Sequence, residues 1–156
     1  MKIMLGFSFG HRGIEPGLSN EMLARVINGL TPAVISVQWE IGIMLHRLGT
    51  TTHHEVSMHR KVGCYLDTEE VARQMIDFLQ KSHLTDKTLY VVAHPAHLPR
   101  CVRILRKLGV TTVNPIKADI PYDPASYQIW TRSPLLFHIR EILAFPIYLF
   151  RGYYTA

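Results

Sequence analysis

Two histidines and an arginine stand at the most informative point of this chain. An apolar run from Thr88 to Ala93 stops at a short loop holding His94 and His97, and Arg100 follows three residues later. Apolar spacing from Leu98 onwards predicts a helix that begins directly after the loop. In open α/β sheets, ligand sites form where a buried strand leads into a helix, because unpaired amides and the positive dipole end face a crevice. We therefore predict that His97 and Arg100 act on an anionic ligand.

The two residue types suit different parts of that task. The imidazole of His97 can serve as general acid, general base or phosphate partner near neutral pH. Arg100, one helical turn further on, can hold a carboxylate or a phosphate. The competing interpretation makes His97 a helix cap and Arg100 a surface residue. Replacing either with alanine separates these alternatives, because the first predicts weaker ligand binding and the second predicts lost stability or no effect.

Further ligand contacts are predicted where the other strands of the same sheet end. The predicted contacts are Gly6, Ser8, Ser36, Gln38, Glu40 and His94. Glu40 can bind a ribose hydroxyl or a cationic amine, and Trp39 can stack on a base, although both also fit an ordinary helix entry. The stretch Gly6 to Gly10 lacks the G-x-G-x-x-G spacing of dinucleotide sites. No G-x-S-x-G elbow surrounds Ser8 or Ser36, which argues against an α/β-hydrolase.

The remaining histidines do not form a recognisable metal site. His94 and His97 are three residues apart without a neighbouring Cys or Asp. His54 and His59 are five apart, so they would not share a helical face as the pair in a metalloprotease helix must. We predict no metal site, and the role of His53, His54 and His59 stays open at this point.

Strand-like and helix-like segments alternate along the whole chain. Strands are predicted at 2–7, 33–37, 55–58, 88–93 and 111–114. Helices are predicted after the N-cap Ser19, after Gln38-Trp39-Glu40, at 69–81 with Asp67 or Thr68 as cap, from Leu98, and from Ser133-Pro134 to a point before Gly152. This alternation predicts right-handed βαβ units in a single α/β domain over residues 1–156, a three-layer Rossmann-like sandwich with a mainly parallel sheet.

Composition limits the classes of protein to consider. Of the 156 residues, 47% are hydrophobic and 19% are charged, which is typical of a globular domain. The net charge of +5 favours acidic or phosphorylated partners, but the basic residues are spread out, so no nucleic-acid partner is predicted. The two cysteines form no disulfide framework and no zinc spacing, so we expect a cytoplasmic location.

The tract Leu135 to Phe150 is the most hydrophobic part of the chain. It is interrupted by His138, Arg140, Glu141 and Pro146, so it is too polar and too short for a membrane span. As a helix it is apolar nearly all round, which predicts burial against the sheet or against a second subunit. Pro146 should kink it. A homo-oligomer through this C-terminal helix is therefore among the expected partners.

The segment Val92-Ala93-His94-Pro95-Ala96-His97-Leu98-Pro99-Arg100, followed by Leu108-Gly109, resembles the conserved stretch of YdcF-like proteins, a bacterial domain of unknown function shared with SanA and ElyC. Ile3-Met4-Leu5-Gly6, Leu18-Ser19 with Arg25, Leu66-Asp67-Thr68-Glu69-Glu70 and Arg140-Glu141 follow in a similar order. Two features depart from that pattern: Ser36-Val37-Gln38-Trp39-Glu40 replaces the usual Ser/Gly-Gly stretch, and His94 replaces a hydroxyl residue. The resemblance implies a Rossmann-like fold and S-adenosylmethionine as a candidate ligand, but no settled reaction.

Three functions are compatible with these observations. The first is a YdcF-like protein that binds a small anionic or nucleotide-like ligand, such as S-adenosylmethionine, at the carboxyl ends of the strands. The second is a hydrolase of a phosphorylated or acyl substrate, with His97 as acid/base and Arg100 stabilising the anion. The third is a non-catalytic oligomeric interaction module that uses the final helix. Ligand-induced thermal shifts would separate a binder from a scaffold, and turnover assays would separate a binder from an enzyme.

Overall fold

Five short segments form the strands of one all-parallel sheet in the computed structural model, which describes residues 1–85 and 87–153. The sheet order is β3-β2-β1-β4-β5. The strands are β1 (Ile3–Gly6), β2 (Val34–Gln38), β3 (His54–Val56), β4 (Leu89–Val92) and β5 (Val113–Pro115). The three inner strands β1, β2 and β4 are buried and rich in β-branched and leucine side chains, as expected for parallel strands covered on both faces.

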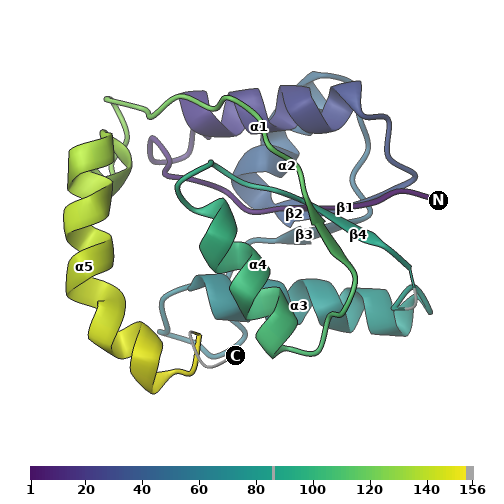
Figure 1. Cartoon of the computed structure of the whole chain (residues 1–156). Coiled ribbons are helices and arrows are strands. Elements are labelled where there is room, and N and C mark those ends of the chain that lie inside the picture. Colours follow the sequence, from purple (N-terminus) through teal and green to yellow (C-terminus); the bar gives the residue numbers. More distant parts are fainter. Residues whose placement is uncertain (86, 154–156) are drawn as a thin grey trace.

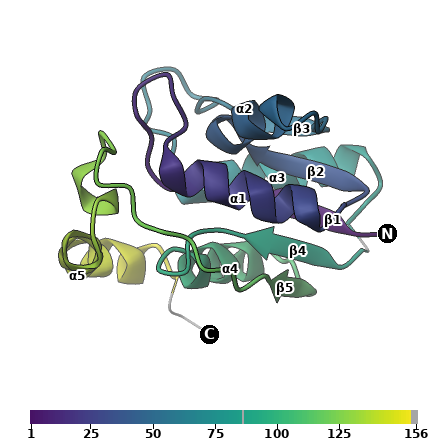
Figure 2. The same ribbon diagram turned by 90° about the horizontal axis from the view of Figure 1, so that it is seen from above.

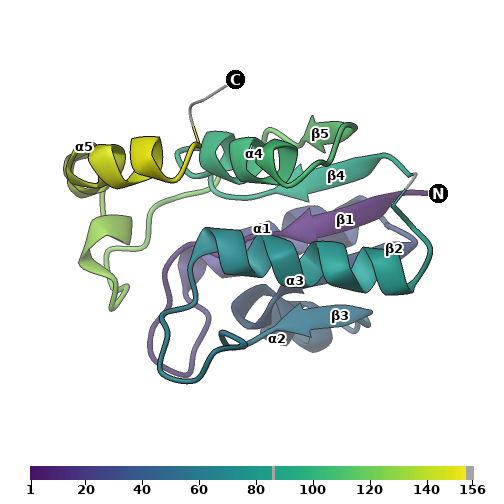
Figure 3. The same ribbon diagram turned by 90° about the horizontal axis from the view of Figure 1, so that it is seen from below.

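Helices cover both faces of this sheet (Figures 1, 2 and 3). One face carries α1 (Leu18–Gly29) and α2 (Trp39–Arg47), and the other carries α3 (Thr68–Lys81) and α4 (Leu98–Lys107). The short 3-10 helix η1 (Ile129–Thr131) and α5 (Pro134–Phe150) stand beyond the end of the sheet. The predicted α/β sandwich, three-layered and Rossmann-like, is confirmed.

Strand alternation divides the core between the two faces. Ile3 and Leu5 of β1 pack into the cluster formed with α3 and α4, whereas Met4 packs with α1 and α2. Gly6 also faces the layer formed by α1 and α2, since a Cβ atom built on it would lie 2.7 Å from Cγ1 of Val37. The absence of a side chain at Gly6 therefore allows α1 and α2 to pack closely over the end of β1.

The strand order reverses beside β1, and this reversal locates the crevice. The chain runs from β1 to β2 and β3 at one edge, then returns to β4 and β5 on the other side of β1. Gly6 pairs with Val37 on β2 and with Val92 on β4, so the carboxyl ends of these three strands are level. The loops that follow them open at the same edge, where doubly wound sheets bind their ligands.

Two of the five α-helices described, α3 and α5, begin at their predicted capping residues. Asp67 caps α3 by accepting a hydrogen bond of 2.9 Å from the Glu70 amide, and Ser133 caps α5 through the Leu136 amide. The prediction for Ser19 is wrong, because Gly17 is the N-cap of α1 and Ser19 lies buried in the first turn. Its hydroxyl donates instead to the Pro121 carbonyl at 2.7 Å, a contact far along the chain that local sequence cannot reveal.

The expectation that the last helix is buried against the sheet is also wrong, while its burial against a second subunit stays a prediction. Only Phe137 and Tyr148 are buried within α5, while Ile142, Leu143 and Phe150 are 71%, 74% and 94% exposed. Four helices already cover the two faces of the sheet, so α5 stands at the end of it (Figure 1). Among the described residues, no helix has the length and apolar character needed to cross a bilayer.

Candidate functional site

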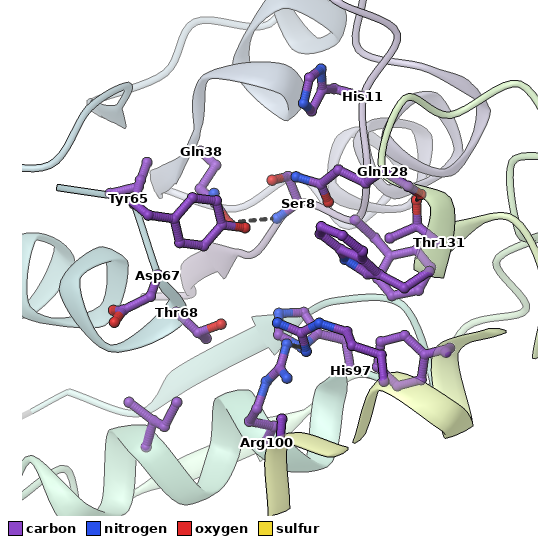
Figure 4. Close-up of a pocket in the computed structure, with 18 of the residues that line it drawn as sticks. Ser8, His11, Gln38, Tyr65, Asp67, Thr68, His97, Arg100, Gln128 and Thr131 are labelled. Atoms are coloured by element: carbon purple, nitrogen blue, oxygen red, sulfur yellow. Dashed lines mark hydrogen bonds between the residues drawn. The ribbon is translucent and has the colours of Figure 1, made fainter. Parts of the chain in front are cut away.

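A cavity of about 480 Å³ opens at the carboxyl edge of the sheet. Its walls are formed by several segments that are distant in the sequence. These are the loop after β1, the start of α2, the region preceding α3, the start of α4, and the inner side of η1 and α5. Figure 4 shows Ser8 and Gln38 on one side of this cavity and His97 and Arg100 on the other. This cavity thus lies at the predicted edge of the sheet, and residues of α5 line its outer side.

A buried asparagine holds the β1 loop in shape at this edge. The Asn20 side chain accepts a hydrogen bond from the Phe9 amide at 2.8 Å and donates to the carbonyls of Gly10 and Pro16 at 2.7 and 2.6 Å. Arg12 anchors the same loop through a bidentate ion pair with Asp123. These contacts fix the loop residues that line the cavity to α1 and to the segment leading to η1.

His97 and Arg100 lie together, as their spacing predicts. The Arg100 Nη2 atom is 2.9 Å from Nδ1 of His97, and both side chains line the cavity (Figure 4). A guanidinium only donates hydrogen bonds, so Nδ1 of His97 is the acceptor and its Nε2 carries the ring hydrogen. Burial lowers the pKa of His97 well below its ordinary value, and the charges of Arg100 and Arg140 act in the same direction.

This protonation state defines what His97 can do. A neutral imidazole whose Nδ1 is occupied by Arg100 presents only an N–H group at Nε2. Such a group can donate a hydrogen bond to an anion but cannot take a proton from a nucleophile. The geometry therefore supplies a hydrogen-bond donor at His97, next to the guanidinium, and supplies no general base there.

A second arginine from α5 joins the pair. Nη1 of Arg100 and Nη1 of Arg140 lie 2.5 and 2.6 Å from the same oxygen of Glu141, and both also donate to the Tyr148 hydroxyl. Arg100 lies over the Tyr148 ring, and Arg140 lies over the Trp130 ring. Two guanidinium groups thus share one carboxylate at the cavity wall, which leaves a net positive charge among these side chains.

The sequence did not single out Arg140, Tyr148 and Trp130 as site residues. They come from α5 and η1, more than thirty residues beyond His97, and nothing in their local spacing indicates that they turn towards the sheet. The apolar pattern of 135–150 points to a buried helix instead, so the polar side chains on its inner face were not recognised. The signal that could have found them is Arg140-Glu141, two charges inside an otherwise apolar helix.

On the opposite side of the cavity, three polar residues gather where β1 and β2 end. The Ser8 amide donates to Oε1 of Gln38 at 2.9 Å (Figure 4). Glu40, in the first turn of α2, is only 7% exposed, and its Oε2 has no hydrogen-bond partner among the described residues. Burial raises the pKa of Glu40 to about 7, against the opposing effect of a Ser8 hydrogen bond. Ser8, Gln38 and Glu40 all line the cavity, together with Trp39.

Three other predicted contacts lie outside the cavity lining. Gly6 faces the layer of α1 and α2, and Ser36 is fully buried within β2 with its hydroxyl 2.8 Å from Nδ1 of His54. His94 lies behind the wall, stacked on Phe9 at 3.9 Å between ring centroids, with Nδ1 accepting from the Ala96 amide. Burial lowers the pKa of His94 to about 4, so this ring is neutral. Its place is structural, since it supports Phe9, which does line the cavity.

The three histidines whose role was open also make local contacts away from the cavity. His53 accepts a hydrogen bond from the Ile35 amide, and His59 accepts one from the Lys61 amide. His54 contacts Ser36 and stacks on Phe78. In residues 1–85 and 87–153 no group of three or more His, Cys, Asp or Glu side chains could hold a metal ion.

Comparisons with known proteins provide no further assignment for this site. Neither a family model, nor a curated protein, nor a solved structure matches the chain. Its chemistry must therefore be argued from the cavity itself.

Proposed function

We propose that this is a YdcF-like protein that binds a small anionic or nucleotide-like ligand in the cavity at the carboxyl ends of the strands. Arg100 and Arg140 hold the anionic group, and Nε2–H of His97 adds a third donor. S-adenosylmethionine is one candidate ligand, because its carboxylate suits the guanidinium groups and its adenosine suits a cavity that contains aromatic side chains.

The observation that carries this proposal is the pair of arginines that share one carboxylate. Their charges are only partly balanced by Glu141, and the Arg100 side chain is only 11% exposed. Nε of Arg100 has no hydrogen-bond partner among the described residues. Charge-assisted hydrogen bonds from guanidinium to carboxylate or phosphate are strong, especially where water is largely excluded. A ligand anion would complete this cluster.

Binding is better supported than hydrolysis with His97 as acid/base. Hydrolysis of a phosphorylated or acyl substrate needs a group that takes a proton from water or from a nucleophile. The His97 ring is neutral and uses its only unprotonated nitrogen to accept from Arg100. A hydrolase would need another residue as general base, so hydrolysis is less well supported than ligand binding.

Calorimetry with defined anions tests the proposal. We expect inorganic phosphate, adenosine monophosphate or S-adenosylmethionine to bind the wild-type protein, and Arg100→Gln and Arg140→Gln each to weaken that binding about tenfold or more, since a charge-assisted hydrogen bond contributes about 1.5–3 kcal/mol. Arg106→Gln is the matched control, because Arg106 is exposed on α4 and does not line the cavity. Equal losses in all three variants, or no binding of any of the anions, would contradict the proposal.

A second candidate function, homo-oligomerisation through α5, is favoured by the exposed apolar surface of that helix. Ile139, Ile142, Leu143 and Phe145 are 43–74% exposed, and an apolar groove runs between η1 and α5. Among the described residues, Arg140 is the one arginine that lines this apolar groove, so the groove offers little positive charge to an anionic membrane. We propose a second copy of the chain as the partner, because an isologous contact needs only this one apolar surface on both sides. Sedimentation velocity should show a dimer.

A further inference from the structure

The carboxyl of Glu40 forms a second polar centre in the same cavity. It is more than nine-tenths buried, it lines the cavity, and its Oε2 has no hydrogen-bond partner among the described residues. An unpaired buried polar group costs free energy that a fold does not recover from packing alone. In a cavity, such a group is a candidate for ligand contact, since a ligand can supply the missing hydrogen bond.

The surroundings of Glu40 favour a neutral, hydroxyl-bearing partner over a cation. The polar neighbours on this side are Ser8 and Gln38, both uncharged. Burial opposes ionisation of the carboxyl, so both protonation states are populated near neutral pH. A carboxyl group in that condition can donate as well as accept, which matches a hydroxyl, itself a donor and an acceptor. An ammonium group would instead require the ionised form, which burial disfavours.

The two polar centres lie on opposite sides of one cavity. Figure 4 shows Ser8 and Gln38 across from His97 and Arg100. Aromatic side chains of Trp130, Phe137 and Tyr65 contribute to the wall. The volume of about 480 Å³ is typical of sites that enclose a small organic molecule. The occupant should therefore carry an anion at one end and hydroxyl groups at the other, with carbon between them to contact the rings.

We propose that the cavity binds a phosphorylated sugar, either free or as part of a nucleotide. Its phosphate lies against Arg100, Arg140 and His97, and its hydroxyl groups hydrogen-bond to Glu40, Ser8 and Gln38. This assignment rests on the proposed anion-binding function and adds the chemical class of the ligand and the residues that select it. Glu40 is a specificity residue here, because it distinguishes a sugar phosphate from a bare phosphate.

Calorimetry on the full chain with four probes tests this assignment. The probes are inorganic phosphate, ribose 5-phosphate, adenosine monophosphate and phosphoethanolamine. We expect ribose 5-phosphate to bind the wild type about tenfold or more tightly than inorganic phosphate, as the added hydroxyl contacts imply. Adenosine monophosphate distinguishes the two sources of the sugar, since a further gain in affinity points to a nucleotide and equal or lower affinity points to a free sugar phosphate.

Variants of Glu40 separate the two centres. Glu40→Met should abolish the advantage of ribose 5-phosphate while leaving the affinity for inorganic phosphate unchanged, which also shows that the variant is folded. Glu40→Gln should recover most of the advantage, because an amide can donate and accept like the carboxyl. Ser8→Ala provides an independent, smaller loss at the same centre, and Glu21→Gln on α1, away from the cavity, should change neither affinity.

The outcomes distinguish failure of this assignment from failure of the proposed function. The assignment is overturned if ribose 5-phosphate gains nothing over inorganic phosphate, if phosphoethanolamine is preferred, or if Glu40→Met weakens both phosphates equally; binding of inorganic phosphate would still support the anion site. If the wild type binds none of the phosphate probes, the anion site is overturned, and the sugar assignment with it.

Discussion

At the scale of single residues, the site depends on how burial sets protonation. His97 and His94 both have lowered pKa values because they are buried, and His97 also lies beside guanidinium groups. Glu40 is shifted in the opposite direction, since burial favours the neutral form of an acid as well as of a base. Near neutral pH the cavity therefore presents a neutral imidazole at His97 and a partly protonated carboxyl at Glu40, and the arginines supply its positive charge.

The raised pKa of Glu40 has a measurable effect on stability. Its value is about 7 in the folded protein against 4.5 for an ordinary glutamate, so the fold binds a proton that the unfolded chain has released. This contribution is fully present below pH 4.5 and is lost as the pH rises through 7. Relative to Glu40→Gln, the wild type should lose on the order of 3 kcal/mol of unfolding free energy between pH 5 and pH 8. Urea denaturation at the two pH values measures the difference.

The matched control for that experiment is Glu21→Gln, the same change of group on α1, where the side chain is paired with Arg25 near the surface. It should show the pH dependence of the wild type. If Glu40→Gln also follows the wild type across this pH range, the Glu40 carboxyl is not held in its neutral form by burial.

At the scale of elements, the end of β1 depends on close packing against α1 and α2. A Cβ atom on Gly6 would lie 2.7 Å from Cγ1 of Val37 and 3.1–3.2 Å from Cδ1 atoms of Ile27 and Ile41. The isoleucine tips can move, but Val37 belongs to a central strand and has little freedom.

Two glycine substitutions with opposite expected signs test this packing. Gly6→Ala should destabilise the protein by about 1–3 kcal/mol, as overpacking of a filled core does. Gly29→Ala should leave stability unchanged or raise it by up to about 1 kcal/mol, because nothing lies within 4 Å of the added methyl group and alanine favours the helix. Denaturant midpoints of the two variants measure both changes. Equal effects would show that the contact at Gly6 relaxes freely.

At the scale of the whole molecule, the layers of the fold could be predicted from the sequence, whereas contacts between segments far apart in the chain could not. Alternating apolar runs and capping signals predict the parallel sheet, and the loop before Leu98 predicts His97 and Arg100 at its edge. These features are local. The cavity wall from η1 and α5 is not, since it depends on contacts such as that of Arg100 with Glu141 across 41 residues. Ser36 was misplaced for a related reason: the sequence does not show that its side chain bonds His54 on the neighbouring strand rather than facing the crevice.

The apolar surface of α5 provides a prediction at this scale. Leu143→Glu should convert a dimer into a monomer, since it places a charge at the centre of the proposed contact, where it would be desolvated. Val62→Glu is the control, because Val62 is 97% exposed, belongs to the segment between β3 and α3 and does not line the apolar groove beside α5. Sedimentation velocity at several concentrations reports the change. A wild type that stays monomeric at high concentration would rule out the second copy.

The carboxylate of Glu141 is itself an anion, and it already contacts the two arginines that are proposed to bind the anionic group of the ligand. Its single oxygen serves both Arg100 and Arg140, and it helps to hold α5 against α4. A ligand anion must therefore compete with the Glu141 carboxylate for Arg100 and Arg140, and this carboxylate is held next to them at high effective concentration. The affinity of the cavity is limited by this competition, and part of the interaction with the arginines is already committed to fastening the last helix. Removing the Glu141 carboxylate would free both arginines for the ligand and would also weaken the attachment of α5 to α4. Ligand affinity and the stability of this helix contact therefore oppose each other at Glu141.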